Sequence, residues 1–153
     1  MHVSILTAAL LAAAAPLTAF AQAASAPADD VAAKAAKEPG AVVTASGLVF
    51  RSLKDGTGPS PKATDVVKVH YRGTFPDGKE FDSSYSRNAP TEFPLDRVIK
   101  CWTEGVQRIK VGGKAKLTCP AAIAYGARGT PGGPIPPNAT LLFEVELLSV
   151  TPR

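Results

Sequence analysis

The sequence predicts an α+β fold in which an antiparallel sheet of five to six strands packs against one short amphipathic helix. The chain has 14 prolines and 13 glycines among 153 residues, an excess typical of turn-rich proteins rather than helical bundles. Apolar and polar residues alternate over residues 65–75, as in a half-buried strand. Over residues 98–109 the apolar period changes to that of a helix, so both kinds of element are expected.

Residues 1–21 are predicted to be a signal peptide rather than part of the fold. No charged residue lies between Ile5 and Ala21, and the segment ends in a small-x-small pattern, Ala19-Phe20-Ala21. A run of about 17 residues is marginal for crossing a bilayer of roughly 30 Å, and an uncleaved membrane anchor is the alternative. After cleavage behind Ala21 the protein would be periplasmic or secreted, without stable membrane insertion. Its compartment would then be oxidising.

Residues 22–43 are predicted to be a flexible tether rich in alanine and lysine. The stretch 31–38 favours a helix by propensity, but about eight residues do not hold a helix without packing. Pro39-Gly40 would end such a helix. The folded domain is therefore expected over residues 44–153, with a formal charge of +5 against −1 for the preceding residues.

The strands are separated by turn residues. The strand over residues 65–75 places Val67, Val69 and Tyr71 on one face, and Asp77-Gly78 marks the hairpin turn that follows. Strands are expected at residues 48–53, 65–75, 80–84, 91–95, 114–120 and 140–150.

The helix is expected over residues 98–109. Trp102, Val106 and Ile109 form its apolar stripe, and Gly112-Gly113 would stop it. One helix covers one sheet face, so the core should lie between helix and sheet. A long loop rich in glycine and proline is expected from Tyr125 to Asn138.

Several classes of chemistry lack their motifs. His70 lies on the polar face of a strand, and no Gly-x-Ser-x-Gly elbow accompanies it. Cys101 and Cys119 lack Cys-x-x-Cys spacing and, together with His70, are too few for a usual metal site. No phosphate-cradling loop is present, and the basic residues lack interleaved aromatics. Neither a metal, a cofactor nor a nucleic-acid partner is therefore expected.

Aromatic side chains come from several different elements. They form either the core alone or an apolar pocket at its edge, and composition does not separate the two. They are Tyr71, Phe81, Phe93, Trp102, Tyr125 and Phe143.

Six strings of residues, in order over about residues 45–150, resemble those of the FK506-binding protein (FKBP) type of peptidyl-prolyl cis-trans isomerase, of the bacterial periplasmic kind. No single string is specific, but six in register are. They are Val69-His70-Tyr71-Arg72-Gly73, Asp77-Gly78-Lys79-Glu80-Phe81-Asp82-Ser83-Ser84, Val98-Ile99-x-x-Trp102-Thr103-Glu104-Gly105, Ala124-Tyr125-Gly126, Ile135-Pro136-Pro137-Asn138-Ala139-Thr140-Leu141 and Phe143-Glu144-Val145-Glu146-Leu147.

The resemblance implies a twisted antiparallel sheet wrapped around the helix, with a pocket between them. Trp102 would form the floor of the pocket, and Phe81 and Phe143 its walls. The residues implied to line it are Tyr71, Phe81, Asp82, Val98, Ile99, Trp102, Tyr125 and Phe143, joined by Ile135 from the long loop.

The resemblance also implies roles for polar groups. Asp82, Tyr125 and Trp102 are the implied catalytic residues, and Arg87 is placed to pair with Asp82. The backbone N–H of Ile99 and the hydroxyl of Tyr125 would each donate to a substrate carbonyl. Whether Asp82 acts on the carbonyl electrostatically or orients its neighbours stays open.

The implied activity is rotation of X-Pro amide bonds in unfolded or partly folded exported polypeptides. A binding or chaperone module that uses the same pocket without catalysis is the alternative. Macrolide inhibitors are implied as further ligands, but Thr91 and the segment 130–134 depart from the pattern of the best-known eukaryotic members and put that affinity in doubt.

The two cysteines are candidates for a disulfide. An oxidising compartment favours a bridge between Cys101 and Cys119, which would stabilise the fold by about 3 kcal/mol on the loop-entropy model. Two buried free thiols are the alternative.

Overall fold

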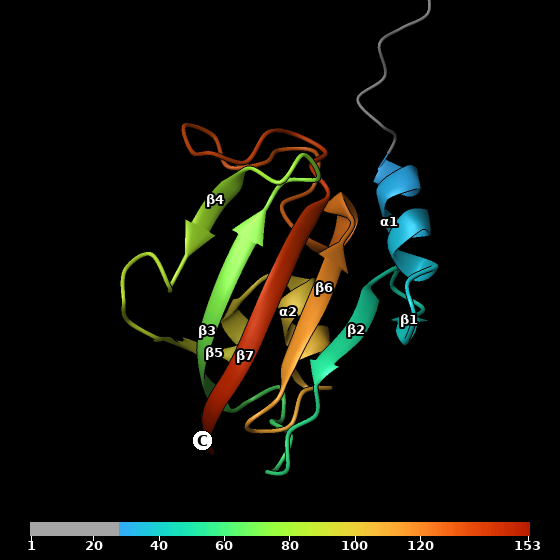
Figure 1. Ribbon diagram of the computed structural model, residues 1–153. Coiled ribbons are helices and arrows are strands. Elements are labelled where there is room, and N and C mark those ends of the chain that lie inside the picture. Colours follow the sequence, from blue (N-terminus) through green and yellow to red (C-terminus); the bar gives the residue numbers. More distant parts are fainter. Residues whose placement is uncertain (1–27) are drawn as a thin grey trace, which may run out of the picture.

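The computed structural model describes residues 28–153, so the predicted signal peptide lies outside the described residues (Figure 1). The strands are β1 (Ala41–Val43), β2 (Val49–Lys54), β3 (Val66–Thr74), β4 (Glu80–Ser83), β5 (Thr91–Pro94), β6 (Lys114–Cys119) and β7 (Leu141–Thr151). They form one antiparallel sheet with the order β1-β2-β6-β7-β3-β4. Strand β5 lies on the same edge of β3 as β4: β5 pairs with residues 66–69 and β4 with residues 72–74. The helices are α1 (Ala28–Ala36) and α2 (Lys100–Val106), with 3-10 turns η1 (Leu95–Arg97) and η2 (Ala121–Ile123).

The core lies between α2 and the face of the sheet that this helix covers, as the sequence predicts (Figure 1). Strands β3 and β7 pair along most of their length and alternate buried and partly exposed residues. Val67 and Val69 are fully buried, and Tyr71 is 5% exposed. The predicted apolar row of β7 is buried as well; its members are Leu141, Phe143, Val145 and Leu147.

Helix α2 is shorter than the predicted span of residues 98–109. It begins after Ile99, whose backbone is extended, and it ends because the amides of Arg108 and Ile109 bond to carbonyls three residues back, at 3.1 and 3.0 Å. Ile109 is nevertheless buried, so the apolar stripe is confirmed although its last turn is not α-helical. Neither helix in the described part of the chain combines the length and apolarity needed to cross a bilayer.

The N-terminal segment differs from its prediction. Residues 28–43, expected as part of a flexible tether, form α1 and then β1, which pairs with β2 at the edge of the sheet (Figure 1). Ala35 of α1 is buried, and the Glu38 carboxylate binds Arg51 at 2.9 Å and Lys116 at 3.1 Å. These contacts with the sheet supply the packing that a short helix lacks in isolation. The sheet therefore has seven strands rather than five or six.

Two features hold α2 close to β6. Cys101 and Cys119 form a disulfide, with their Cα atoms 5.8 Å apart, so the predicted bridge is present. Gly105 faces the side chain of Leu117, and a Cβ at that position would lie 2.8 Å from a Leu117 methyl carbon. Because only glycine allows this approach, the helix and the strand are packed at a short, defined distance.

Candidate active site

Trp102 forms an aromatic floor at the centre of the site. It lies in the first turn of α2 and is 4% exposed. Its ring meets those of Tyr71, Phe93 and Phe143 edge to face, with centroid separations of 5.1, 5.4 and 5.4 Å. These three rings come from β3, β5 and β7, so one helix residue gathers aromatic side chains from three strands of the sheet.

The aromatic cluster continues toward the surface through Phe81. The Phe81 ring lies 5.6 Å from that of Phe143 and 5.0 Å from that of Phe75, and it is only half-buried. Gly73 makes room for it, because a Cβ there would lie 2.5 Å from the Phe81 ring. The Trp102 indole N–H has no hydrogen-bond partner among residues 28–153. The floor is therefore apolar, and its donor is free.

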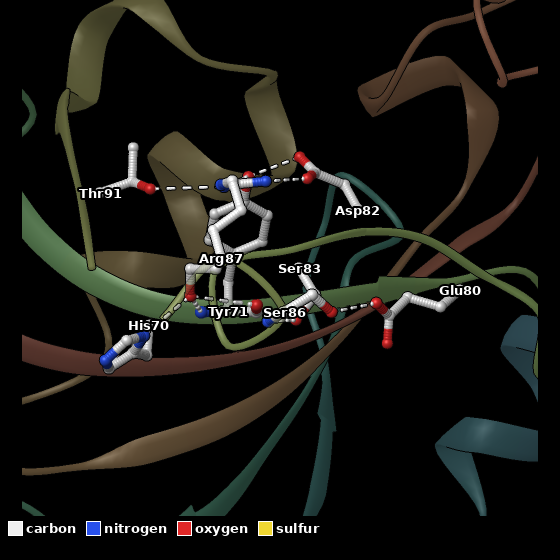
Figure 2. A network of polar contacts seen from close by, with 9 residues as sticks. His70, Tyr71, Glu80, Asp82, Ser83, Ser86, Arg87 and Thr91 are labelled. Carbon is white, nitrogen blue, oxygen red and sulfur yellow. Dashed lines mark hydrogen bonds and ion pairs between the residues drawn. The ribbon is translucent and has the colours of Figure 1, made fainter. Parts of the chain in front are cut away.

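A polar network stands beside this floor (Figure 2). The Tyr71 hydroxyl donates to one oxygen of Asp82 at 2.5 Å, and Arg87 donates to the other oxygen at 2.6 Å. A second guanidinium nitrogen of Arg87 donates to the Tyr71 hydroxyl at 3.0 Å and also reaches Thr91 at 3.5 Å. The carboxylate, phenol and guanidinium thus fix one another, and the implied Arg87–Asp82 pair is confirmed.

The network sets the protonation of its members. Burial disfavours the charged form of Asp82, but the hydrogen bonds from Tyr71 and Arg87 outweigh it and hold the pKa of this carboxyl below its usual range. Burial and the bond to Asp82 raise the pKa of Tyr71. At neutral pH the site therefore contains an ionised carboxylate and a neutral phenol that donates to it.

The loop that carries Arg87 is built on Ser84. This residue is fully buried, and its hydroxyl accepts from the Tyr71 backbone N–H at 2.7 Å and contacts His70 at 2.9 Å. The Ser84 carbonyl accepts from the N–H groups of Arg87 and Ala89, both at 3.2 Å. These bonds fold the chain back, so that the guanidinium faces the carboxylate that precedes it in sequence.

Tyr85 fastens the same loop to the opposite face of the sheet. Its ring stacks on His70 with centroids 4.7 Å apart, and its hydroxyl donates to Glu146 at 3.2 Å. Burial and this bond raise the pKa of Tyr85 to about 12. His70 thus takes part in supporting contacts, and nothing about it suggests nucleophilic chemistry.

The long loop after β6 brings Tyr125 and Ile135 to the site. Tyr125 is 40% exposed, and burial together with the charge of Asp82 raises the pKa of its hydroxyl. Ile135 is buried, and its N–H and carbonyl bond to Thr130 at 2.9 Å each. Gly129 permits this closure: its φ is +60°, and a Cβ would lie 2.7 Å from the Pro136 carbonyl carbon.

Val98 and Ile99 border the site from the segment between η1 and α2. Both side chains are half-buried and pack against the core. The Ile99 carbonyl accepts from the amides of Trp102 and Thr103 at 3.0 and 3.1 Å, whereas its own N–H donates no hydrogen bond within residues 28–153. A backbone donor is thus left free beside the aromatic floor.

Six of the predicted site residues lie in one aromatic and polar cluster. Asp82, Arg87 and Tyr71 are in direct contact, and Phe81, Trp102 and Phe143 form the adjoining rings. Two further aromatics of this cluster, Phe75 and Phe93, were not among the predicted site residues. Phe75 directly follows β3 and Phe93 lies within the four-residue β5, and none of the six motif strings includes either residue. No three metal-ligating side chains among the described residues gather closely enough to hold an ion.

Comparison with known proteins identifies relatives over most of the folded part. A family model described as FKBP-type peptidyl-prolyl cis-trans isomerase matches residues 58–148. The isomerase FkpA of Escherichia coli is 54% identical over 119 residues, which cover 78% of this chain and 43% of the relative. FkpA of Aeromonas hydrophila is 54% identical over 115 residues, covering 75% and 42%. The chain thus spans less than half the length of these curated relatives.

Solved structures agree with this fold. The crystal structure of Escherichia coli FkpA superposes with a TM-score of 0.78 at 51% identity, covering 82% of this chain and 58% of that chain. A peptidyl-prolyl cis-trans isomerase of Pseudomonas syringae gives a TM-score of 0.75 at 40% identity, covering 81% and 90%. The fold, the order of the motifs and the aromatic site agree, and the chain belongs to the FKBP-type peptidyl-prolyl cis-trans isomerase family.

Proposed function

We propose that this chain catalyses cis-trans isomerisation of X-Pro bonds in polypeptides. The observation that supports this most directly is the Trp102 floor beside the Asp82–Tyr71–Arg87 network. An apolar surface and a small set of oriented polar groups adjoin there, and no nucleophile is needed. The chain's membership of the family supports the same activity.

The reaction requires rotation about an amide bond against a barrier of roughly 18–20 kcal/mol. In the twisted state resonance is broken, so the carbonyl is less polar and the proline nitrogen is pyramidal. An apolar site favours that state over the planar, well-solvated ground state, and only such differential binding raises the rate. Each factor of ten requires about 1.4 kcal/mol of it.

The chain's own residues would divide this task. The prolyl ring would rest on Trp102 between the Phe81 and Phe143 rings. The Ile99 N–H and the Tyr125 hydroxyl would donate to carbonyls on either side of the bond that rotates. Asp82, held ionised by its partners, would act on the polarised amide through its charge, and Arg87 would keep it oriented.

A proline-peptide isomerisation assay tests the proposal. Trp102→Leu and Asp82→Asn are each expected to lower kcat/KM at least about ten-fold, because each removes a group that adjoins the rotating bond. Asp77→Asn is the matched control, since Asp77 bonds only the Lys79 amide in the β3–β4 turn. Circular dichroism verifies that each variant is folded.

A folded protein without isomerase activity would contradict the proposal. Suppression of aggregation that survives Asp82→Asn would then favour the alternative, a non-catalytic binding or chaperone module. A macrolide that competes with the peptide would show that the inhibitor shares the site; weak competition would fit the departures at Thr91 and in the segment 130–134.

We also propose that the protein acts outside the cytoplasm on exported polypeptides. The uncharged stretch ending in Ala19-Phe20-Ala21 supports a cleaved leader, and the Cys101–Cys119 disulfide fits an oxidising compartment. The mass of the protein recovered from the periplasm or the medium should correspond to a chain that begins at Gln22. Recovery of the full-length chain in membranes would instead identify an uncleaved anchor.

A further inference from the structure

Three carboxylates close to the proposed isomerase site are engaged by other groups of the chain. Asp82 is bonded to its tyrosine and arginine partners, as described above. Asp96 forms an ion pair with Arg153 at 2.8 Å, and Glu104 accepts a hydrogen bond from Ser46 at 2.5 Å. Asp82 and Asp96 are thus paired with arginines before any substrate binds, whereas Glu104 is bonded to a neutral hydroxyl.

Three cations beside the site lack such partners. Arg97 and Lys100 flank the Val98-Ile99 pair, and Arg128 lies in the loop between η2 and β7 that carries the rim tyrosine. All three side chains are exposed, and none takes part in an ion pair within residues 28–153. Glu92 of β5 is an exposed carboxylate that also forms no ion pair within residues 28–153, so three unpaired cations face one unpaired anion and the balance at this border is positive.

A groove continues from the site along α2. It is open to solvent and has a volume of about 680 Å³. Its lining comprises Val98, Lys100, Thr103, Gln107 and Arg108 together with two of the engaged carboxylates, Asp96 and Glu104. Val98 belongs both to this groove and to the proposed site. A polypeptide whose proline occupies the site can therefore extend along the groove, where it passes Lys100.

We propose that the site selects polypeptide segments in which acidic side chains flank the proline. The proposal rests on the isomerase function proposed above and adds the class of substrate to it. An exposed cation within reach of a carboxylate changes affinity by about 1.5- to 5-fold, and a like charge opposes binding by a similar factor. The three cations together are expected to favour a glutamate-flanked peptide over a lysine-flanked one by about ten-fold at low salt.

The experiment compares two peptides that differ only in having glutamate or lysine on both sides of the same X-Pro pair. The ratio of their kcat/KM values is measured with the whole chain at ionic strengths of about 20 mM and about 0.5 M, where exposed charges are screened. The same ratio is measured for Lys100→Glu and for the triple change at Arg97, Lys100 and Arg128 to glutamate. Lys54→Glu, on β2 near the other edge of the sheet, is the control with the same change in net charge.

The ratio is expected to favour the glutamate peptide, to approach one at high salt, to fall about two- to five-fold in Lys100→Glu, and to reverse in the triple variant. Lys54→Glu should retain the wild-type ratio. Equal turnover of both peptides at low salt, or an equal effect of Lys54→Glu, would overturn the selection proposed here while leaving the isomerase function intact. Absence of turnover for either peptide would instead refute the isomerase function itself.

Discussion

Breaking the disulfide between Cys101 and Cys119 is expected to lower the free energy of unfolding by about 3 kcal/mol. The bridged residues lie 18 apart in sequence. Closing a loop of that length in the unfolded chain removes roughly 11 cal/mol/K of entropy, or about 3.2 kcal/mol at 25 °C on the loop-closure model. Both cysteines are fully buried, so replacing them also removes packed sulfur atoms.

Urea denaturation followed by the fluorescence of Trp102 measures the effect in three forms of the protein. The reduced wild type differs from the oxidised one only in the cross-link, whereas Cys101→Ala/Cys119→Ala also loses the sulfur packing. A loss of 3 kcal/mol moves the urea midpoint by about 1–3 M. The alanine variant should be no more stable than the reduced protein and should not respond to reductant. A reduced wild type within about 0.5 kcal/mol of the oxidised one would refute the entropic reasoning.

Three further outcomes are expected. Asp82→Asn should destabilise the protein most at neutral pH. Because the folded pKa of Asp82 is lowered, the carboxylate contributes stability above the unfolded value of about 3.9, and this contribution is lost as pH falls through the folded pKa. The difference in unfolding free energy between wild type and variant should therefore close on acidification. Gly129→Ala should lower the free energy of unfolding by more than about 1 kcal/mol, because the added Cβ clashes with Pro136 at a position that already has a positive φ. Gly132→Ala should lower it less in the same urea titration, because Gly132, with φ of +74°, has open space around it. Glu38→Gln should lower the free energy of unfolding by less than about 1 kcal/mol, because the two ion pairs of Glu38 are partly exposed, yet it should accelerate hydrogen exchange over residues 28–36. Unchanged exchange would show that these pairs do not hold α1 against the sheet.

The central elements could be predicted from the sequence because burial imposes a period on them. Residues on β3, and on β7 as far as Leu147, alternate between more and less buried positions, since one face of each strand meets the core and the other is more exposed. Trp102 and Ile109 were assigned to one buried stripe, and both are buried. The last turn of α2 could not be foreseen, because the change to bonds three residues back leaves the apolar spacing almost unaltered.

The structure of residues 28–43 could not be predicted, because it depends on contacts with distant parts of the chain. Their helix is stabilised by contacts with strands far along the chain: Glu38 reaches Arg51 on β2 and Lys116 on β6. The spacing of the alanines does not indicate that such long-range ion pairs form. The same holds for the site. The resemblance implied the Arg87–Asp82 pair, which is present. The part played by Phe75 and Phe93 depends instead on contacts between rings from different elements, with Phe81 and with Trp102.

The lengths of the strands have a consequence for a protein proposed to work among unfolded chains. The unpaired edges of the sheet belong to β1, with three residues, and to β4 and β5, with four each, whereas β3 and β7 at the centre have nine and eleven. A long free edge is a template on which an extended polypeptide adds as a further strand. Here each edge offers only a few backbone groups, and a register shift at Gly73/Thr74 interrupts the pairing beside β4. An unfolded polypeptide bound at the proposed site would thus have little opportunity to join the sheet as a further strand.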